Sequence, residues 1–156
     1  MANKKEFEVE RKNLDTVRVA SIRWRGKYGD CGERLSALFK KMGRYSCGKP
    51  MNLYYDEGYK NEDADIETCI PIREGKEIEG ISIRTIEGGP GLALIHKGPY
   101  DQLSESYERL TNYAKEHGLA IKGPGREVYI KGPGMIFKGN PKKYLTEIQF
   151  PLVEKS

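Results

Sequence analysis

The residues best suited to chemistry lie in the stretch Gly123-Pro-Gly-Arg-Glu-Val-Tyr-Ile130. Glu127 and Tyr129 are two positions apart in an expected strand, so their side chains point to the same face of it. Val128 and Ile130 then point to the other face. Strand interiors disfavour glutamate, so a carboxylate beside an aromatic ring needs an explanation. One explanation is a solvated face, because acids usually lie outside. The other is the floor of an acidic, aromatic pocket.

The composition predicts one globular domain, residues 1–156. Hydrophobic residues make up 37% of the chain and charged residues 32%, which is typical of a soluble protein with a moderate core. No apolar run approaches the roughly 20 residues that a membrane-spanning helix needs. The first residues lack the apolar core of a signal peptide. We therefore expect a cytoplasmic protein without a membrane partner.

Metal, disulfide and nucleic-acid chemistry are not expected. The cysteines Cys31, Cys47 and Cys69 are odd in number and far from any other cysteine or histidine at ligand spacing. They indicate free thiols rather than a disulfide frame or a metal site, and we expect no metal and no cofactor. The net charge of +4 comes from lysines mixed with acids, and no DNA-binding or RNA-binding signature is present. Direct nucleic-acid contact is therefore not expected.

The elements that must position Glu127 are short strands and two amphipathic helices. One helix is predicted from Asp30, with Glu33 as its capping-box partner, to a stop at Gly43. A second helix is predicted over about 101–117, and a polar segment over 1–15 leads into the first strand. A tight turn is expected over 88–91. The predicted strands cover residues 16–24, 51–56, 65–70, 81–86, 92–96, 127–130 and 144–150.

The order of elements repeats. Gly26-Lys-Tyr28 corresponds to Gly98-Pro-Tyr100, and the strand that ends Glu67-Thr-Cys-Ile-Pro71 corresponds to the one that ends Glu147-Ile-Gln-Phe-Pro151. The half-repeats span about 16–71 and 92–151. We therefore predict an α+β fold of duplicated β-α-β-β units related by a pseudo-twofold axis. Its antiparallel sheet would carry both helices on one side, with a ligand cleft between the halves on the other.

Alternation along the strands assigns side chains to the two faces. Ile66, Thr68 and Ile70, with Ile148 and Phe150, are expected to face the helices. Glu67, Cys69, Glu147 and Gln149 are expected to face the cleft, and Asn52 and Tyr54 correspond to Glu127 and Tyr129 across the repeat. The candidate ligand-binding residues, on the open face or at its rim, are Glu127, Tyr129, Tyr54, Glu67, Glu147, Trp24, Tyr28, Tyr100 and His96.

These residue types favour a planar, lipophilic and cationic small molecule. Aromatic faces attract cations by roughly 0.5–2 kcal/mol each. A buried carboxylate is costly unless it is paired, so a cationic ligand would supply its partner. The alternative for Glu67 and Glu147 is that they only cap strand ends by accepting hydrogen bonds from nearby amides. The alternative for His96 is a packed residue.

A set of short motifs, taken together, is specific for one family. The motifs are His96-Lys-Gly-Pro-Tyr-Asp-Gln-Leu103, Tyr107, Gly118, Gly123-Pro with Glu127-Val-Tyr129, and Thr146-Glu-Ile-Gln-Phe-Pro151. With them the sequence resembles, over about 16–152, the gyrase-inhibitor-like (GyrI-like) family, also called the bacterial transcription activator effector-binding domain. The resemblance implies the duplicated fold and an aromatic-lined cleft with an acid at its base, which corresponds to Glu127 and meets lipophilic cations in multidrug-binding regulators. It also implies a stand-alone binding domain, because the chain has no room for a DNA-binding domain.

The resemblance leaves two other functions open. Some stand-alone members resemble hydrolases of cyclopropanoid DNA-alkylating compounds, in which Glu127, Glu147 and Tyr129 would activate water and bind the developing oxyanion. A gyrase-inhibitor-like protein interaction is the other, and a homodimer also stays open. The insertion 132–141 departs from the shorter linker expected here, and its Met135-Ile-Phe137 would form an apolar lid or pack on the sheet edge.

Overall fold

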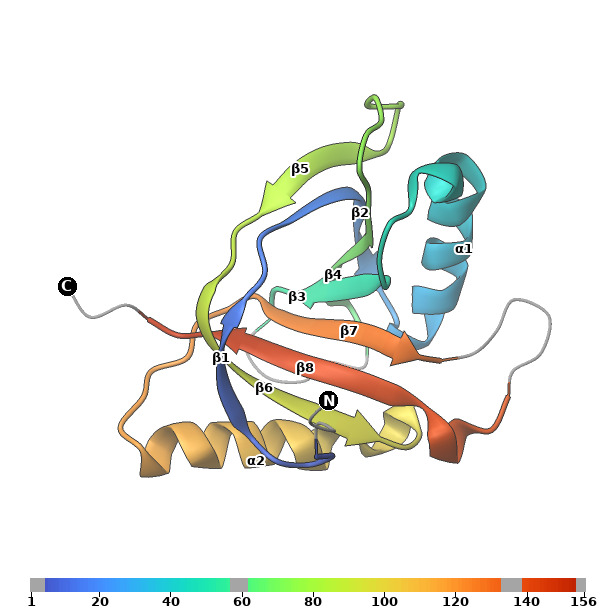
Figure 1. Ribbon diagram of the computed structural model, residues 1–156. Helices are drawn as coiled ribbons and strands as arrows, with labels where there is room; N and C mark the ends of the chain where they lie inside the picture. Colours follow the sequence, from blue (N-terminus) through green and yellow to red (C-terminus); the bar gives the residue numbers. More distant parts are fainter. Residues whose placement is uncertain (1–4, 57–61, 133–138, 154–156) are drawn as a thin grey trace.

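The computed structural model describes residues 5–56, 62–132 and 139–153, which form one antiparallel sheet of eight strands with two α-helices (Figure 1). Short 3-10 turns, η1 (Tyr28–Asp30) and η3 (Tyr100–Gln102), directly precede the helices α1 (Cys31–Met42) and α2 (Leu103–Glu116). Two further 3-10 turns are η2 (Gly43–Tyr45) and η4 (Pro141–Lys143). The strands are β1 (Glu10–Leu14), β2 (Val17–Gly26), β3 (Met51–Tyr54), β4 (Ala64–Pro71), β5 (Ser82–Ile86), β6 (Gly89–Lys97), β7 (Gly125–Lys131) and β8 (Leu145–Pro151).

The strand order confirms the duplicated α+β fold. The sheet runs β1-β6-β8-β7-β3-β4-β2-β5, so the unit β6-α2-β7-β8 and the unit β2-α1-β3-β4 meet where β7 pairs with β3. At this junction Asn52 is the register partner of Glu127. The two residues that correspond across the repeat therefore lie side by side at the centre of the sheet.

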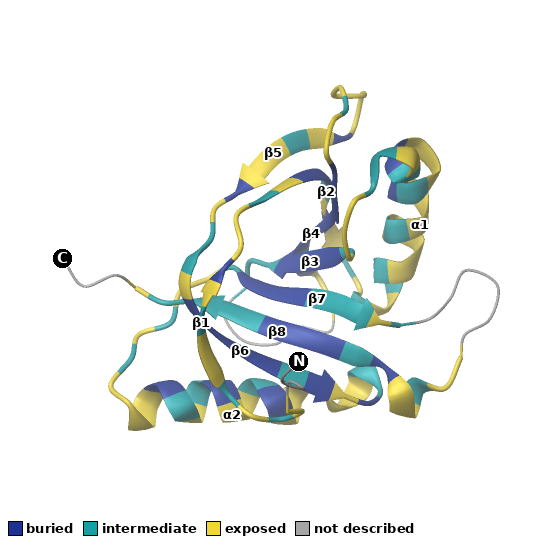
Figure 2. Ribbon diagram, in the orientation of Figure 1, coloured by how far each residue is buried: buried dark blue, intermediate teal, exposed yellow. Residues whose placement is uncertain are grey.

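Both helices bury an apolar stripe against the sheet, as their helical spacing predicts. Leu38 and Met42 of α1 are fully buried and pack with Ala20 and Ile70. The α2 stripe packs against β6 and β8 through Leu103, Leu110, Ala114, Leu92, Leu94 and Ile148. Figure 2 shows the consequence, since both helices are exposed on their outer side and buried toward the strands. No helix in the described ranges is long and apolar enough to cross a membrane.

Local features differ from expectation in three places. β1 is an edge strand whose residues are mostly exposed, so it lacks the apolar alternation that would have revealed it. Residues 89–91 belong to β6 rather than to a tight turn. The capping box is wrong, because η1 holds Asp30 at φ −86° and ψ 0° and its side chain makes no capping hydrogen bond. An N-cap residue normally has extended backbone, which the 3-10 turn excludes. Met135-Ile-Phe137 lies outside the described residues.

Candidate ligand-binding site

A buried carboxylate with tyrosine hydroxyls around it lies at the junction of the two halves. Glu127 is 1% exposed. Its Oε1 accepts hydrogen bonds from Tyr28 and Tyr129, both at 2.8 Å, and from Tyr54 at 3.3 Å. Its Oε2 accepts from the hydroxyl of Tyr107. Within the described residues these five form one group, which we call the acid–tyrosine cluster.

Both halves of the fold contribute to the acid–tyrosine cluster. Tyr54 lies on β3 and Tyr129 on β7, and their hydroxyls are 3.0 Å apart. Tyr28 belongs to η1, directly before α1, and Tyr107 lies on α2. Since α2 reaches Glu127 through Tyr107, the cluster lies on the helix-facing side of the sheet. The duplication therefore brings one acid and four tyrosine rings together where the two β-α-β-β units meet.

The tyrosine rings lie between the acid and solvent. Tyr28 and Tyr54 stack with their ring centroids 5.7 Å apart and an interplanar angle of 16°. Tyr100 meets Tyr129 edge-on, also at 5.7 Å. All of these rings, like that of Tyr107, are partly exposed. A flat molecule that approached from solvent would therefore meet aromatic faces before it reached the carboxylate.

The Asn52 side-chain amide donates hydrogen bonds to two of the tyrosine hydroxyls. Its Nδ2 donates to the hydroxyl of Tyr129 at 2.9 Å and to that of Tyr54 at 3.1 Å. Each phenol oxygen can accept one bond and donate its single O–H to Glu127. The chain of donors therefore runs from the amide through the tyrosines to the carboxylate, and this direction stabilises the ionised form of Glu127.

The pKa of Glu127 is nevertheless raised above its ordinary value. Burial raises it, and the hydrogen bonds from Tyr107, Tyr28, Tyr129 and Tyr54 lower it without cancelling the effect of burial. Burial, followed by the charge of Glu127, also raises the pKa of the Tyr54 and Tyr129 hydroxyls, which keeps them protonated as donors. No lysine, arginine or histidine of the described ranges forms an ion pair with Glu127. When Glu127 is ionised, its charge therefore lacks a cationic partner in these ranges, and a bound cation would supply one.

This raised pKa predicts a pH dependence of stability. The folded state holds the Glu127 proton more tightly than the unfolded chain does, so the contribution of Glu127 to stability falls as pH rises from about 4.5 through the folded pKa. Glu127→Gln removes the titration. Denaturant unfolding across pH should show the variant gaining stability relative to wild type as pH rises over this window. A difference that is flat, or that slopes the other way, would contradict the raised pKa.

The expected common face is wrong. Glu127 was expected on the side of the sheet away from the helices, with Glu67 and Glu147, but it lies on the helix-facing side, and only the two other acids lie on the expected side. Glu127 is the register partner of Ile148 and Val128 that of Glu147, while Leu53 is the partner of Glu67. Paired residues point to the same face, so both acids lie on the face opposite Glu127. Alternation within a strand shows which of its residues share a face. It does not show how residues of neighbouring strands pair, and the pairing assumed from the sequence was wrong by one residue. The expected helix-facing positions of Ile70, Ile148 and Phe150 are confirmed.

Glu67 and Glu147 have their own partners on that opposite face. Glu67 accepts from Ser21, from Tyr55 and from two nitrogens of Arg84. Glu147 accepts from Lys12 at 3.0 Å and from Gln149 at 2.5 Å. Because Glu147 and Glu127 are separated by the sheet, they cannot act on one bond as an acid–base pair. This arrangement removes Glu147 from the hydrolytic mechanism that the resemblance suggested.

Trp24 and His96 are buried rather than at a rim. The Trp24 indole donates to Thr68 at 2.9 Å, and its ring packs beside Tyr54. His96 is 1% exposed, with its Nδ1 2.7 Å from the Ser106 hydroxyl. Burial lowers the pKa of His96, which suits a packed neutral imidazole.

Comparison with known sequences decides the family. The sequence matches the GyrI-like small molecule binding domain over residues 7–153. The chain belongs to the GyrI-like family. No curated protein sequence matches it.

Solved structures agree with this GyrI-like assignment. The EcmrR C-terminal domain is 25% identical with a TM-score of 0.83, over 95% of this chain and 98% of that one. The chain covers 58% of EcmrR as solved in a complex with DNA. A hydrolase from Listeria innocua is 13% identical with a TM-score of 0.75, over 96% and 94% of the two chains. SAV2435 bound to tetraphenylphosphonium is 14% identical with a TM-score of 0.56, over 94% of each chain. The last two likenesses show the fold alone.

Two residues of this GyrI-like site were not expected to bind a ligand. Tyr107 belongs to the apolar stripe of α2, where its hydroxyl is the polar end of an otherwise hydrophobic face. Asn52 corresponds to Glu127 across the repeat. The available signal was a polar group at a core position of each element. The Tyr107 hydroxyl donates to the acid, and the Asn52 amide donates to the hydroxyl of Tyr129.

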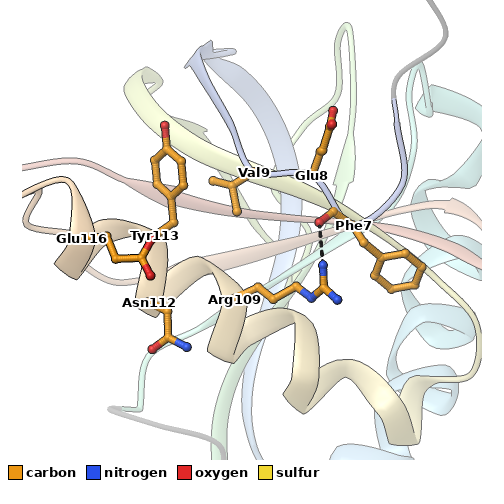
Figure 3. A pocket seen from close by; sticks show the side chains of 7 residues that line it. All are labelled: Phe7, Glu8, Val9, Arg109, Asn112, Tyr113 and Glu116. Atoms are coloured by element: carbon orange, nitrogen blue, oxygen red, sulfur yellow. Dashed lines mark hydrogen bonds between the residues drawn. The ribbon is translucent and has the colours of Figure 1, made fainter.

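The GyrI-like domain has a hollow away from the acid–tyrosine cluster. A shallow pocket of about 500 Å³ lies between the N-terminal segment and α2 (Figure 3). Arg109 closes one side of it and donates to the Phe7 carbonyl. The pocket carries acids and a base side by side, so its charge favours no particular ligand. Its lining residues are Phe7, Glu8, Val9, Arg109, Asn112, Tyr113 and Glu116.

Proposed function

We propose that this GyrI-like domain binds a lipophilic, planar cation at the acid–tyrosine cluster. The observation that carries the proposal is the Glu127 carboxylate, which is 1% exposed and has no cationic partner in the part of the chain that the structure describes. Hydrogen bonds from tyrosines offset part of its desolvation but leave its charge uncompensated. A cation bound beside it would provide the compensation.

The rings define the rest of the ligand. A cation over an aromatic face gains about 0.5–2 kcal/mol, and the gain is larger when water is excluded. Tyr28, Tyr54 and Tyr129 supply such faces within hydrogen-bond reach of the acid. These three tyrosines are partly exposed, so their rings could stack on the aromatic groups of a flat ligand. A delocalised or aryl-substituted cation fits these requirements better than a small hydrated ion.

The family supports the same class of ligand. SAV2435, which shares the fold, was solved with tetraphenylphosphonium, an aryl-substituted cation. EcmrR was solved on DNA, but the part of it that this chain matches is the C-terminal domain. We therefore assign this chain the role of a small-molecule binding domain rather than one that contacts DNA through these residues.

Calorimetric titration with tetraphenylphosphonium tests the proposal, because the charge of this probe does not change with pH. We expect a dissociation constant in the micromolar range, on the order of −8 kcal/mol of binding free energy. The affinity should rise with pH as Glu127 loses its proton, since the cation binds the ionised form. Triphenylphosphine oxide is the neutral comparison and should show no such rise. Equal, pH-independent affinity for the two compounds would refute the proposal.

A further inference from the structure

A buried hydrogen-bond acceptor beside Glu127 has no partner. Asn52 is 2% exposed, and its Oδ1 makes no hydrogen bond with any described residue, although its Nδ2 makes two. Buried polar atoms are nearly always paired, so an open acceptor at a candidate site indicates a place for a ligand atom. It lies within the acid–tyrosine cluster because the same amide contacts Tyr54 and Tyr129.

The hydroxyl network fixes which end of the amide is open. Tyr129 has one O–H, and this group donates to Glu127 at 2.8 Å. If the Asn52 amide were turned over, its Oδ1 would need the O–H of Tyr54 or Tyr129, and Glu127 would lose that donor while remaining buried. The ionised acid therefore orients Nδ2 toward the tyrosines and leaves Oδ1 open.

Asn52 and Glu127 are neighbours on one face of the sheet. They are direct register partners on β3 and β7, on the same face of the sheet. Directly opposite residues of an antiparallel pair have their Cβ atoms about 4.5–5.5 Å apart. One charged nitrogen could therefore contact the carboxylate and the amide oxygen together. Both groups are acceptors only, so the nitrogen must bring hydrogens to satisfy both.

We infer that Asn52 makes this site prefer cations that carry N–H groups, such as protonated amines and amidines, over fully substituted ammonium or phosphonium ions of similar shape. The inference rests on the proposed function and specifies its ligand class. Fully substituted cations still bind through charge and ring contacts, but they leave Oδ1 unpaired. A cation with N–H groups adds one interaction, a hydrogen bond to Oδ1 of Asn52.

A matched pair of probes tests this preference. Biphenyl-4-ylmethylammonium carries N–H donors, and its N,N,N-trimethyl analogue has the same rings and charge without them. We expect wild-type protein to prefer the first by about tenfold, the effect of one added hydrogen bond. Asn52→Leu removes the acceptor at similar volume and should abolish the preference, and Asn52→Ala provides a second removal.

The outcomes separate the inference from the proposed function. Equal affinity of wild type for the two probes would overturn the inference. A preference that persists in Asn52→Leu and Asn52→Ala would also overturn the inference. The methyl groups of the trimethyl probe, rather than the hydrogen bond to Asn52, would then explain the difference in affinity. In both cases the cation site stands if Glu127→Gln weakens both probes. If Glu127→Gln changes neither affinity, the proposed function fails as well. Thermal unfolding of each variant establishes that it is folded.

Discussion

Glu127→Gln should weaken the binding of tetraphenylphosphonium about 30-fold at neutral pH and leave the fold intact. The substitution keeps the size of the side chain and an oxygen that can accept from the tyrosines. It removes the charge that faces the cation. Removing one partner of a buried charge pair costs about 2 kcal/mol or more, which corresponds to this factor. Calorimetry on both proteins measures it directly.

The sheet provides a matched control for this change. Glu147 is also a buried strand glutamate, 5% exposed, but it lies on the opposite face with Lys12 and Gln149. Glu147→Gln is the same chemical change and should leave the affinity within about twofold, since single buried contacts off the site add little. If the two variants lose affinity equally, the effect is a general one on charge or stability. The Glu127 site would then be wrong.

The fold could be predicted from sequence because its signals are local and occur twice. Leu38 and Met42 recur at helical spacing and are buried on the sheet, as are Leu103 and Leu110 in the second half. The correspondence of Gly26-Lys-Tyr28 with Gly98-Pro-Tyr100 placed a turn before each helix, and both segments contribute 3-10 turns there. β1 gave no such signal because an edge strand of exposed residues needs no apolar pattern.

The site could be predicted only in part, because its composition depends on pairing between distant strands. Glu127, Tyr129, Tyr54 and Tyr28 were expected together and do meet. Glu67 and Glu147 were expected with them, but a one-residue difference in the assumed register places a strand's residues on the opposite face. Alternation within a strand carries no information on that offset. Tyr107 was not among the expected ligand-binding residues, yet on the sheet-facing stripe of α2 it packs its ring in the core and directs its hydroxyl to the acid.

Arg84→Met should cause the largest loss of stability among these changes, about 2 kcal/mol, because Glu67 is buried while the 41% exposed Arg84 is partly screened by solvent. Glu67 is 4% exposed and is held by Arg84 Nε at 2.8 Å and Nη2 at 2.6 Å. Without the guanidinium, a buried carboxylate keeps only the hydroxyls of Ser21 and Tyr55. Denaturant unfolding at neutral pH measures the loss. Adding Glu67→Gln to the variant should restore part of it, because the unpaired charge is then removed.

The pH dependence of that loss distinguishes the ion pair from packing. Burial would raise the pKa of Glu67, but Arg84, Ser21 and Tyr55 outweigh it and lower the pKa from 4.5 to about 2. A lowered folded pKa gives stability that is complete above 4.5 and is lost as pH falls toward 2, so the gap between wild type and Arg84→Met should close over this range. Arg23→Met is the control, since Arg23 pairs with Asp65 in the same two-bond geometry but in a more exposed pair. The side chains of Arg23 and Asp65 are 56% and 19% exposed, against 41% and 6% for Arg84 and Glu67. Arg23→Met should cost about 1 kcal/mol or less. Equal losses from the two arginines would show that burial does not set the strength of the Glu67 pair.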